Sequence, residues 1–173
     1  MTPTLWSIAG VAAIGVVALL LLRRRPGGAA LPTGVPVRYT NHARERMAER
    51  GVSEQQIVTT LNRPDRHEPD RVENSVRVER DFDGRTLKVW VAESWPPRGE
   101  AVVKSTAWHY HDTMRVPVDR LGALIGRKGS TIEGIRRTTG TRINVERDGT
   151  VQISGDDRAA VQAAKRAVGK IVR

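Results

Sequence analysis

The residue types best suited to contact phosphate lie in one short segment of the chain, Gly126-Arg127-Lys128-Gly129. Glycines allow the backbone to approach a sugar-phosphate chain at distances that a Cβ atom would prevent. The Arg127 and Lys128 side chains add positive charge, which contacts phosphate without reading base sequence. A helix that begins directly after Gly129 would point its free N–H groups and its positive dipole end at the same place. The segment therefore predicts a phosphate-contacting loop.

A second set of chemically capable side chains recurs every four residues, at His42, Arg46 and Arg50, and would share one face of a helix. Such a strip could face RNA, with His42 as a general acid or base. The alternative is structural, with the arginines paired to local acids such as Glu45 and Glu49 while His42 caps or packs. The nearly balanced charge of the surrounding segment favours the structural alternative. These three residues are therefore weak catalytic candidates, and we expect no enzyme.

The sequence offers no metal or thiol chemistry. The chain has no cysteine, which excludes disulfides, thiol catalysis and Cys-ligated zinc. His109 and His111 could place two imidazoles on one side of a strand, but no further carboxylate follows at a ligand spacing. We therefore expect neither a metal nor another cofactor.

The positive charge of the chain is unevenly distributed. The 173 residues, enough for one ordinary domain or two small ones, carry a net charge of +10, which favours nucleic acid or an anionic membrane surface as partner. Residues 1–22 have no charged side chain, and residues 23–37 have three arginines and no acid. Residues 38–111 hold 13 basic and 12 acidic residues, whereas residues 112–173 hold 13 and 7. The excess therefore lies beside the N-terminal segment and in the last third.

The elements around the glycine loop can be read from periodicity and turn signals. Ser130 and Glu133 have the spacing of a capping box, and Gly140 would end the helix that they begin. The expected elements are, in order, a strand at 114–119, a brief helix ending at Ile125, a helix from Ser130 to Gly140, strands at 141–146 and around Val151 and Ile153, and a final helix. The predicted order is βααββα.

A G-x-x-G loop between two short helices in this order resembles a type I KH domain, over about residues 113–173, and most of all the KH domain of bacterial polynucleotide phosphorylase. That enzyme's catalytic domains have no counterpart here, so the resemblance implies nucleic-acid binding. It implies a groove that holds about four nucleotides of single-stranded RNA, with single-stranded DNA as an alternative ligand. The alternative function is a KH relic that contacts only protein. The implied binding residues are Leu124, Ile125, Gly126, Arg127, Lys128, Gly129, Ser130, Ile132, Arg142 and Ile143.

The middle segment, residues 38–111, predicts a small ααβββ domain. Thr40 or Asn41 would cap a helix that ends at Gly51, and Ser53 would open a second helix that stops before Pro64. Alternation on both sides of Asp83-Gly84 then predicts a hairpin. Val72, Asn74, Val76 and Val78 would point one way on its first strand, and Leu87, Val89 and Val91 would face them on the return strand. Residues 101–108 predict a third strand.

Within this segment the signature His42-Ala43-x-x-Arg46-Met47-x-x-Arg50-Gly51 resembles a small, poorly characterised bacterial family, over about residues 38–108. That family is thought to be related in fold to RelE-type toxins, which are ribosome-dependent ribonucleases. The resemblance implies a fold and leaves the activity of the segment open.

The N-terminal segment, residues 1–22, predicts a membrane anchor. Residues 5–22 are uncharged and would span about 27 Å as a helix, close to the hydrocarbon core of about 30 Å. Arg23, Arg24 and Arg25 follow, and positive flanks stay in the cytoplasm, so we expect a single pass through the bacterial inner membrane with the N-terminus outside. The alternatives are a cleaved signal peptide and a buried helix. Residues 23–37, basic and rich in proline and glycine, predict a flexible linker.

Together these features predict an α+β protein with an N-terminal transmembrane helix, an ααβββ domain and a KH domain at residues 112–173. The predicted function is a membrane-anchored, cytoplasm-facing protein that binds single-stranded RNA through its G-R-K-G loop. One alternative is a RelE-like ribonuclease to which the KH domain delivers substrate. Another is a non-catalytic scaffold that binds a protein partner through residues 38–111.

Overall fold

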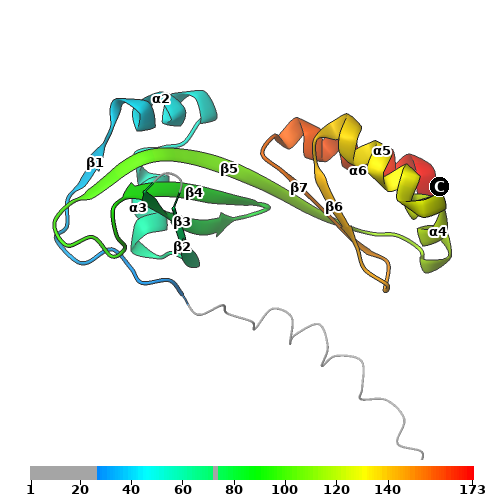
Figure 1. Ribbon diagram of the computed structural model, residues 1–173, viewed down its shortest axis with the longest axis horizontal. Helices are drawn as coiled ribbons and strands as arrows, with labels where there is room; N and C mark the ends of the chain where they lie inside the picture. Colours follow the sequence, from blue (N-terminus) through cyan, green and yellow to red (C-terminus); the bar gives the residue numbers. More distant parts are fainter. Residues whose placement is uncertain (1–26, 72–73) are drawn as a thin grey trace, which may run out of the picture.

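A single seven-stranded sheet runs through the part of the chain that this computed structural model describes, residues 27–71 and 74–173 (Figure 1). Its strand order is β2-β3-β4-β5-β7-β6, and β1 pairs with β5 off this path. The strands are β1 (Val37–Tyr39), β2 (Arg66–Asp70), β3 (Ser75–Phe82), β4 (Arg85–Ala92), β5 (Ala101–Arg115), β6 (Arg142–Val145) and β7 (Thr150–Gly155). The helices are α2 (Asn41–Arg50), α3 (Glu54–Asn62), α4 (Leu121–Ile125), α5 (Ser130–Thr139) and α6 (Arg158–Val172), with 3-10 turns η1 (Val118–Arg120) and η2 (Arg127–Gly129). The fold class is α+β, as predicted.

β5 is one 15-residue strand that belongs to both halves of the sheet. On one side it pairs with β4 as far as Tyr110, opposite Arg85, and from Tyr110 onward it pairs with β7, where Gly155 lies opposite. The sequence predicts two separate strands here, with a domain boundary between residues 111 and 112. That boundary falls inside β5, because no glycine or proline interrupts these 15 residues to end the strand.

The two helices of the first half begin and end where the sequence predicts. Thr40 caps α2, its Oγ1 accepting from the Ala43 backbone N at 3.1 Å, and Gly51 ends the helix in the left-handed region at φ 58°. Ser53 and Gln56 form a capping box at the start of α3, with reciprocal hydrogen bonds of 3.2 and 2.9 Å. The polar side chains at these positions therefore satisfy backbone groups that the first helical turn leaves unpaired.

The core of the first half lies on one face of the hairpin formed by β3 and β4. Val76 and Val78 are buried together with Leu87, Val89 and Val91, as their alternation predicts, whereas Val72 lies outside the described residues. The cluster also contains Ala43, Met47, Val52, Ile57, Leu61, Ala101, Val103 and Trp108.

Two strands of the first half are not predicted by the sequence. β1 has three residues and pairs with β5 in parallel, and β2 has five residues, includes Pro69 and pairs only with β3 at the edge of the sheet. An edge strand can contain proline because one of its sides needs no ladder hydrogen bonds. β2 shows no apolar alternation that would have identified it, whereas in β1 Val37 and Tyr39 flank Arg38 in a strand of only three residues.

The described part of the predicted linker is packed against the first half of the sheet. Gly28 N donates to Pro64 O at 3.0 Å and Leu31 N donates to Leu61 O at 2.8 Å. Trp95 Nε1 donates to Ala29 O at 2.6 Å, and the side chain of Leu31 packs against the core. These contacts attach residues 28–31 to the first half of the sheet, in a segment for which the sequence predicts a flexible linker.

The helices that the structure describes do not support the predicted location in the bacterial inner membrane, and this prediction is corrected here. Across residues 27–71 and 74–173, no helix combines the length and the apolar character that crossing a membrane requires. The predicted span itself, residues 5–22, and the arginines that follow it lie outside the described residues.

Candidate nucleic-acid interface

The C-terminal unit comprises the end of β5 and everything after it, in the predicted βααββα order. β7 lies between β5 and β6 and pairs antiparallel with both. The helices bury apolar residues against this three-stranded part of the sheet, and the shared core consists of Val116, Leu124, Ile132, Ile135, Ile143, Val151, Ile153, Val161, Ala164 and Val168. The loop between α4 and α5 is therefore anchored at both ends by packed helices.

The G-R-K-G loop has a backbone that requires glycine. Gly126, Lys128 and Gly129 have φ angles of 75°, 54° and 82°, all in the region that L side chains rarely adopt. A Cβ atom at Gly126 would lie 2.1 Å from Thr131 Oγ1, whereas a Cβ at Gly129 would meet no atom within 4 Å. Gly126 is therefore required for packing within the protein, and Gly129 leaves open space in front of the loop.

The start of α5 differs from the sequence prediction. The N-cap residue is Gly129, without a side-chain cap, so the predicted capping box of Ser130 and Glu133 does not form. Glu133 instead accepts from Arg136 Nη1 at 3.1 Å, within the same helix. The N–H groups of the first turn of α5 are thus not occupied by a capping side chain, and an external anion could accept from them.

The implied binding residues divide into exposed and buried groups. Arg127, Lys128, Ser130 and Arg142 are exposed. The apolar residues Leu124, Ile132 and Ile143 are buried, with exposed fractions of 0%, 7% and 2%, and only Ile125 is open to solvent, at 40%.

A further exposed apolar side chain, Val118, lies in η1 at 61% exposure. The alternation of Val116 and Val118 predicts two strand residues on one face. Pro117 instead separates them, because β5 has ended and Val118 begins a 3-10 turn. Pro117 is the sequence signal that could have shown that Val118 lies outside the strand, because proline has no N–H for the hydrogen bonds between strands.

β6 presents polar side chains on the sheet face opposite the helices. Arg142 and Asn144 are exposed on either side of the buried Ile143. Arg136 of α5 donates through Nη2 to the backbone O of Ile143, which ties α5 to β6. This contact holds the helix that follows the loop at a fixed position relative to the strand that carries Arg142.

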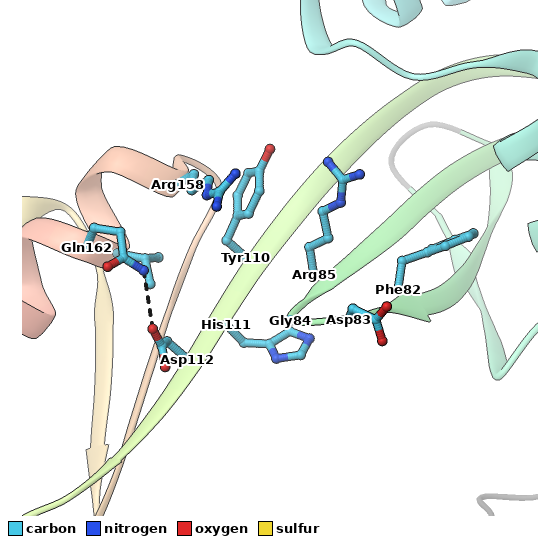
Figure 2. Close-up of a pocket in the computed structure, with 10 residues that line it drawn as sticks. Phe82, Asp83, Gly84, Arg85, Tyr110, His111, Asp112, Arg158 and Gln162 are labelled. Carbon is cyan, nitrogen blue, oxygen red and sulfur yellow. Dashed lines mark hydrogen bonds between the residues drawn. The ribbon is translucent and has the colours of Figure 1, made fainter.

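A cavity of about 590 Å³ lies where the two halves of the sheet meet on β5. Figure 2 shows Arg85, Tyr110 and Arg158 on its wall, together with Gln162, which donates to Asp112 Oδ2 at 3.2 Å. Its lining contains two arginines and two aspartates, so it has no excess of positive charge.

His42, Arg46 and Arg50 of α2 lie on one face of the helix, as their spacing predicts, and all three border a cavity of about 380 Å³. Arg46 also pairs with Glu49 at 2.6 Å, and Arg50 Nη1 donates to Thr106 O at 2.6 Å. These contacts match part of the structural alternative.

His109 forms a hydrogen bond with a carboxylate of the C-terminal half. His109 Nδ1 lies 2.7 Å from Asp156 Oδ1, and this hydrogen bond lowers the pKa of Asp156 below its ordinary value, although burial acts in the opposite direction. Across the described residues, no three or more His, Asp or Glu side chains gather closely enough to hold a metal ion.

Comparison with known proteins gives separate matches for the two halves. Residues 111–170 match the KH domain family, and residues 39–108 match a domain of unknown function, DUF4258. The polyribonucleotide nucleotidyltransferases of Micrococcus luteus and Acidothermus cellulolyticus are 48% and 42% identical to this chain over 59 residues. Those residues are 34% of this chain and 8% of either relative, so the chain spans less than a tenth of the length of these relatives.

Among solved structures, the chain is similar to a crystal structure of an a/eIF2alpha–aDim2p–rRNA complex from Pyrococcus horikoshii. The sequence identity is 33% and the TM-score is 0.36, over 38% of this chain and 40% of that chain. The family matches, and not this structure, give a KH domain at residues 111–170, after a segment at residues 39–108 that matches DUF4258.

Proposed function

We propose that this protein binds single-stranded RNA through the groove of its KH domain, with the G-R-K-G loop on the sugar-phosphate chain. One observation carries the proposal: the loop leaves open space in front of Gly129 at the uncapped start of α5. Arg127 and Lys128 are exposed beside that space. We assign the phosphate to this open space, where backbone N–H groups, the helix dipole and the charges of Arg127 and Lys128 would all attract it.

The bases would lie against the apolar side chains next to the loop. Ile125, next to Gly126, offers exposed apolar surface, and Val118 of η1 is a second exposed apolar side chain, whereas Leu124, Ile132 and Ile143 are buried. Arg142 is exposed on β6, and its contact with a base edge stays a prediction from the sequence. KH domains hold about four nucleotides in this way, so we expect a short site of modest affinity.

The relatives support RNA as the ligand and do not support an enzyme reaction. Their name describes an enzyme that acts on polyribonucleotides, and this chain aligns with 8% of the length of each. The aligned part is the KH segment, so nucleic-acid contact is the property that the similarity supports. The ribonuclease and protein-scaffold hypotheses for residues 38–111 stay predictions.

Fluorescence anisotropy with a labelled single-stranded RNA of eight nucleotides tests the proposal. The full-length chain should bind, and the double variant Arg127→Asp/Lys128→Asp should lose at least about tenfold in affinity, because repulsion replaces two phosphate contacts. The matched control is Arg44→Asp/Arg98→Asp, which changes the net charge equally at exposed positions of the first half. Equal losses for both double variants would show that net charge alone drives binding, against the groove assignment. Single-stranded DNA of the same sequence tests the alternative ligand.

A further inference from the structure

The cavity bordered by His42, Arg46 and Arg50 of α2, called the α2 pocket below, has a local excess of positive charge. Among the described residues, its charged lining consists of Arg46, Arg50 and Lys104 against the carboxylate of Asp70. Four other hollows in the described residues are each lined by equal numbers of basic and acidic side chains, with histidine not counted. Because residues 38–111 are nearly neutral overall, this excess is specific to the pocket and favours an anionic ligand.

Ser75 adds a polar group that the protein itself leaves unused. This residue begins β3, lines the α2 pocket and is 4% exposed. Its Oγ has no hydrogen-bond partner within residues 27–71 and 74–173. Leaving a buried hydroxyl unpaired costs on the order of 1–3 kcal/mol. A ligand oxygen in the pocket would supply the missing partner.

Trp90 supplies an aromatic surface on the same wall. Its ring is half-buried and lines the pocket, and its Nε1 donates to Asp70 Oδ2 at 2.9 Å, which fixes the orientation of the indole. Aromatic faces of this kind stack nucleobases with little regard to base identity. A cationic wall and an aromatic wall within one small hollow match the two parts of a nucleotide.

We propose that the α2 pocket binds one nucleoside monophosphate unit, with its phosphate on Arg46 and Arg50 and its base against Trp90. Both arginines also make contacts within the protein, but a guanidinium has five N–H donors, so donors remain for a ligand. A cavity of about 380 Å³ lies in the size range of small-molecule sites. The site is separate from the G-R-K-G loop and does not rest on the KH proposal.

Titration of the full-length chain with adenosine 5′-monophosphate, followed by calorimetry and tryptophan fluorescence, tests this assignment. The nucleotide should bind and quench fluorescence, whereas adenosine and inorganic phosphate should each bind at least about tenfold more weakly, because each makes only half of the contacts. Trp90→Phe should remove the quench. Ser75→Ala should weaken binding severalfold, since it removes the unpaired hydroxyl.

Arg46→Gln should weaken nucleotide binding by about tenfold or more, because a charge-assisted hydrogen bond is lost. The matched control is Arg44→Gln, on the same helix, where the side chain pairs with Glu54 at 3.3 Å and lies over the Tyr39 ring. This control should change the affinity less than twofold. The proposal is wrong if no nucleotide binds or if both variants weaken binding equally. It is also wrong if a polyglutamate peptide competes as well as the nucleotide without quenching, which would indicate an acidic protein ligand.

The KH variant separates this proposal from the proposed RNA groove. Arg127→Asp/Lys128→Asp should leave the binding of adenosine 5′-monophosphate unchanged, because a single nucleotide does not fill a groove built for about four. Loss of RNA binding in a chain that still binds the nucleotide would support both assignments. Loss of nucleotide binding in this variant would overturn the α2 pocket.

Discussion

Lys165 of α6 donates to both carboxylate oxygens of Asp112 on β5, at 3.0 and 2.9 Å. Gln162, one turn earlier on α6, donates to the same carboxylate. Burial raises the pKa of Asp112, but the hydrogen bonds and the charge of Lys165 outweigh it, and the pKa lies below its ordinary value. The last helix of the KH domain is thus attached to the strand that both halves of the sheet share.

Replacing this carboxylate should make the chain less stable in a pH-dependent way. A carboxyl whose pKa is lowered by folding stabilises the fold above its unfolded pKa of about 3.9, and the contribution is lost as pH falls through the folded pKa. Asp112→Asn should therefore lower the free energy of unfolding by about 1 kcal/mol at pH 7. Urea unfolding should show this difference shrinking below about pH 4. The control is Asp119→Asn, since Asp119 is exposed and 3.8 Å from Arg120. A pH-independent loss would contradict the ion pair as its source.

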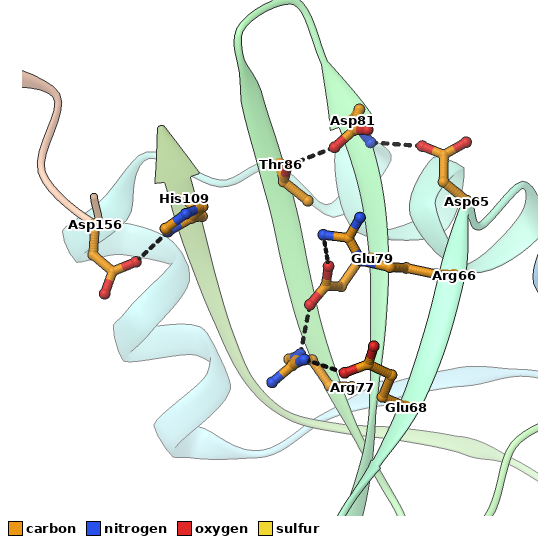
Figure 3. Close-up of polar contacts among 9 residues, drawn as sticks. All are labelled: Asp65, Arg66, Glu68, Arg77, Glu79, Asp81, Thr86, His109 and Asp156. Carbon is orange, nitrogen blue, oxygen red and sulfur yellow. Dashed lines mark hydrogen bonds and ion pairs between the residues drawn. The ribbon is translucent and has the colours of Figure 1, made fainter. Parts of the chain in front are cut away.

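Glu79 should be the carboxylate whose loss most destabilises the first half of the sheet. It is 2% exposed and lies between Arg66 and Arg77, as Figure 3 shows. Glu79→Gln would leave two guanidiniums without their shared buried counter-charge. We expect a loss of about 2–3 kcal/mol, below the range for fully buried pairs because both arginines are partly exposed.

The matched control for Glu79 is Glu68→Gln. Glu68 pairs with Arg77, one of the two arginines that contact Glu79, at 2.6 Å, but the Glu68 side chain is largely exposed. Exposed pairs of this kind contribute about 0.2–1 kcal/mol. Chemical denaturation of both variants tests the prediction, and similar losses would mean that burial does not set the cost.

Substitution by alanine should change the free energy of unfolding by different amounts at the two glycines of the loop. Gly126→Ala forces a Cβ to within 2.1 Å of Thr131 Oγ1 at a φ of +75°, and we expect a loss of about 2 kcal/mol or more. Gly129→Ala meets open space and should cost about 1 kcal/mol for its φ alone. Gly134→Ala, inside α5 and unhindered, should instead stabilise by about 0.5–1 kcal/mol. Thermal unfolding of the three variants measures this order. The requirement for glycine at position 126 is wrong if Gly126→Ala is not the most destabilising of the three.

Substitutions at Ile125 and Leu124 should distinguish a side chain that contacts RNA from one that packs in the core. Ile125→Ser should weaken RNA binding severalfold and change stability little, because its side chain is 40% exposed. Leu124→Ala should cost about 2–5 kcal/mol of stability, because it leaves a cavity in the KH core. RNA titration and thermal unfolding of both variants distinguish the two roles. A stable Ile125→Ser variant with unchanged RNA affinity would remove Ile125 from the groove.

Local signals in the sequence predict the elements that depend on their own residues. Thr40, Ser53 and Gly51 mark helix ends because caps act within one turn, and the G-R-K-G loop is recognisable because it requires glycine geometry. The order βααββα follows from the same kind of local signal.

Features that depend on distant parts of the chain are not predictable in this way. Pairing with β7 extends β5 beyond its apolar stretch, and contacts with Pro64 and Leu61 hold Gly28 and Leu31 in place. Burial of Leu124 in the KH core is likewise decided by tertiary packing, since its apolar type fits a groove equally well. The α2 pocket could be predicted in part, because spacing places the strip on one face, but Trp90 and Ser75 come from other strands.

The continuity of β5 makes the stability of the KH domain depend on residues before 112. Tyr110 packs against the cores of both halves and lies opposite Gly155, and His111 lies opposite Ser154. A fragment 112–173 loses both strand pairs and the Tyr110 contact, whereas a fragment 110–173 keeps them. Loss of about 1–2 kcal/mol corresponds to roughly 5–15 °C in the unfolding midpoint of a domain this small.

Circular dichroism melting of the two fragments measures this difference, with the longer fragment expected to melt higher. In the full-length chain, Tyr110→Ser should lower the unfolding midpoint as well, because its ring fills space between two cores. The matched control is Thr113→Ser, which lies on the same strand opposite Gln152 and outside both clusters. Equal midpoints for the two fragments would show that the KH domain is independent of the shared strand, because the pairs made by Tyr110 and His111 would then contribute nothing to its fold.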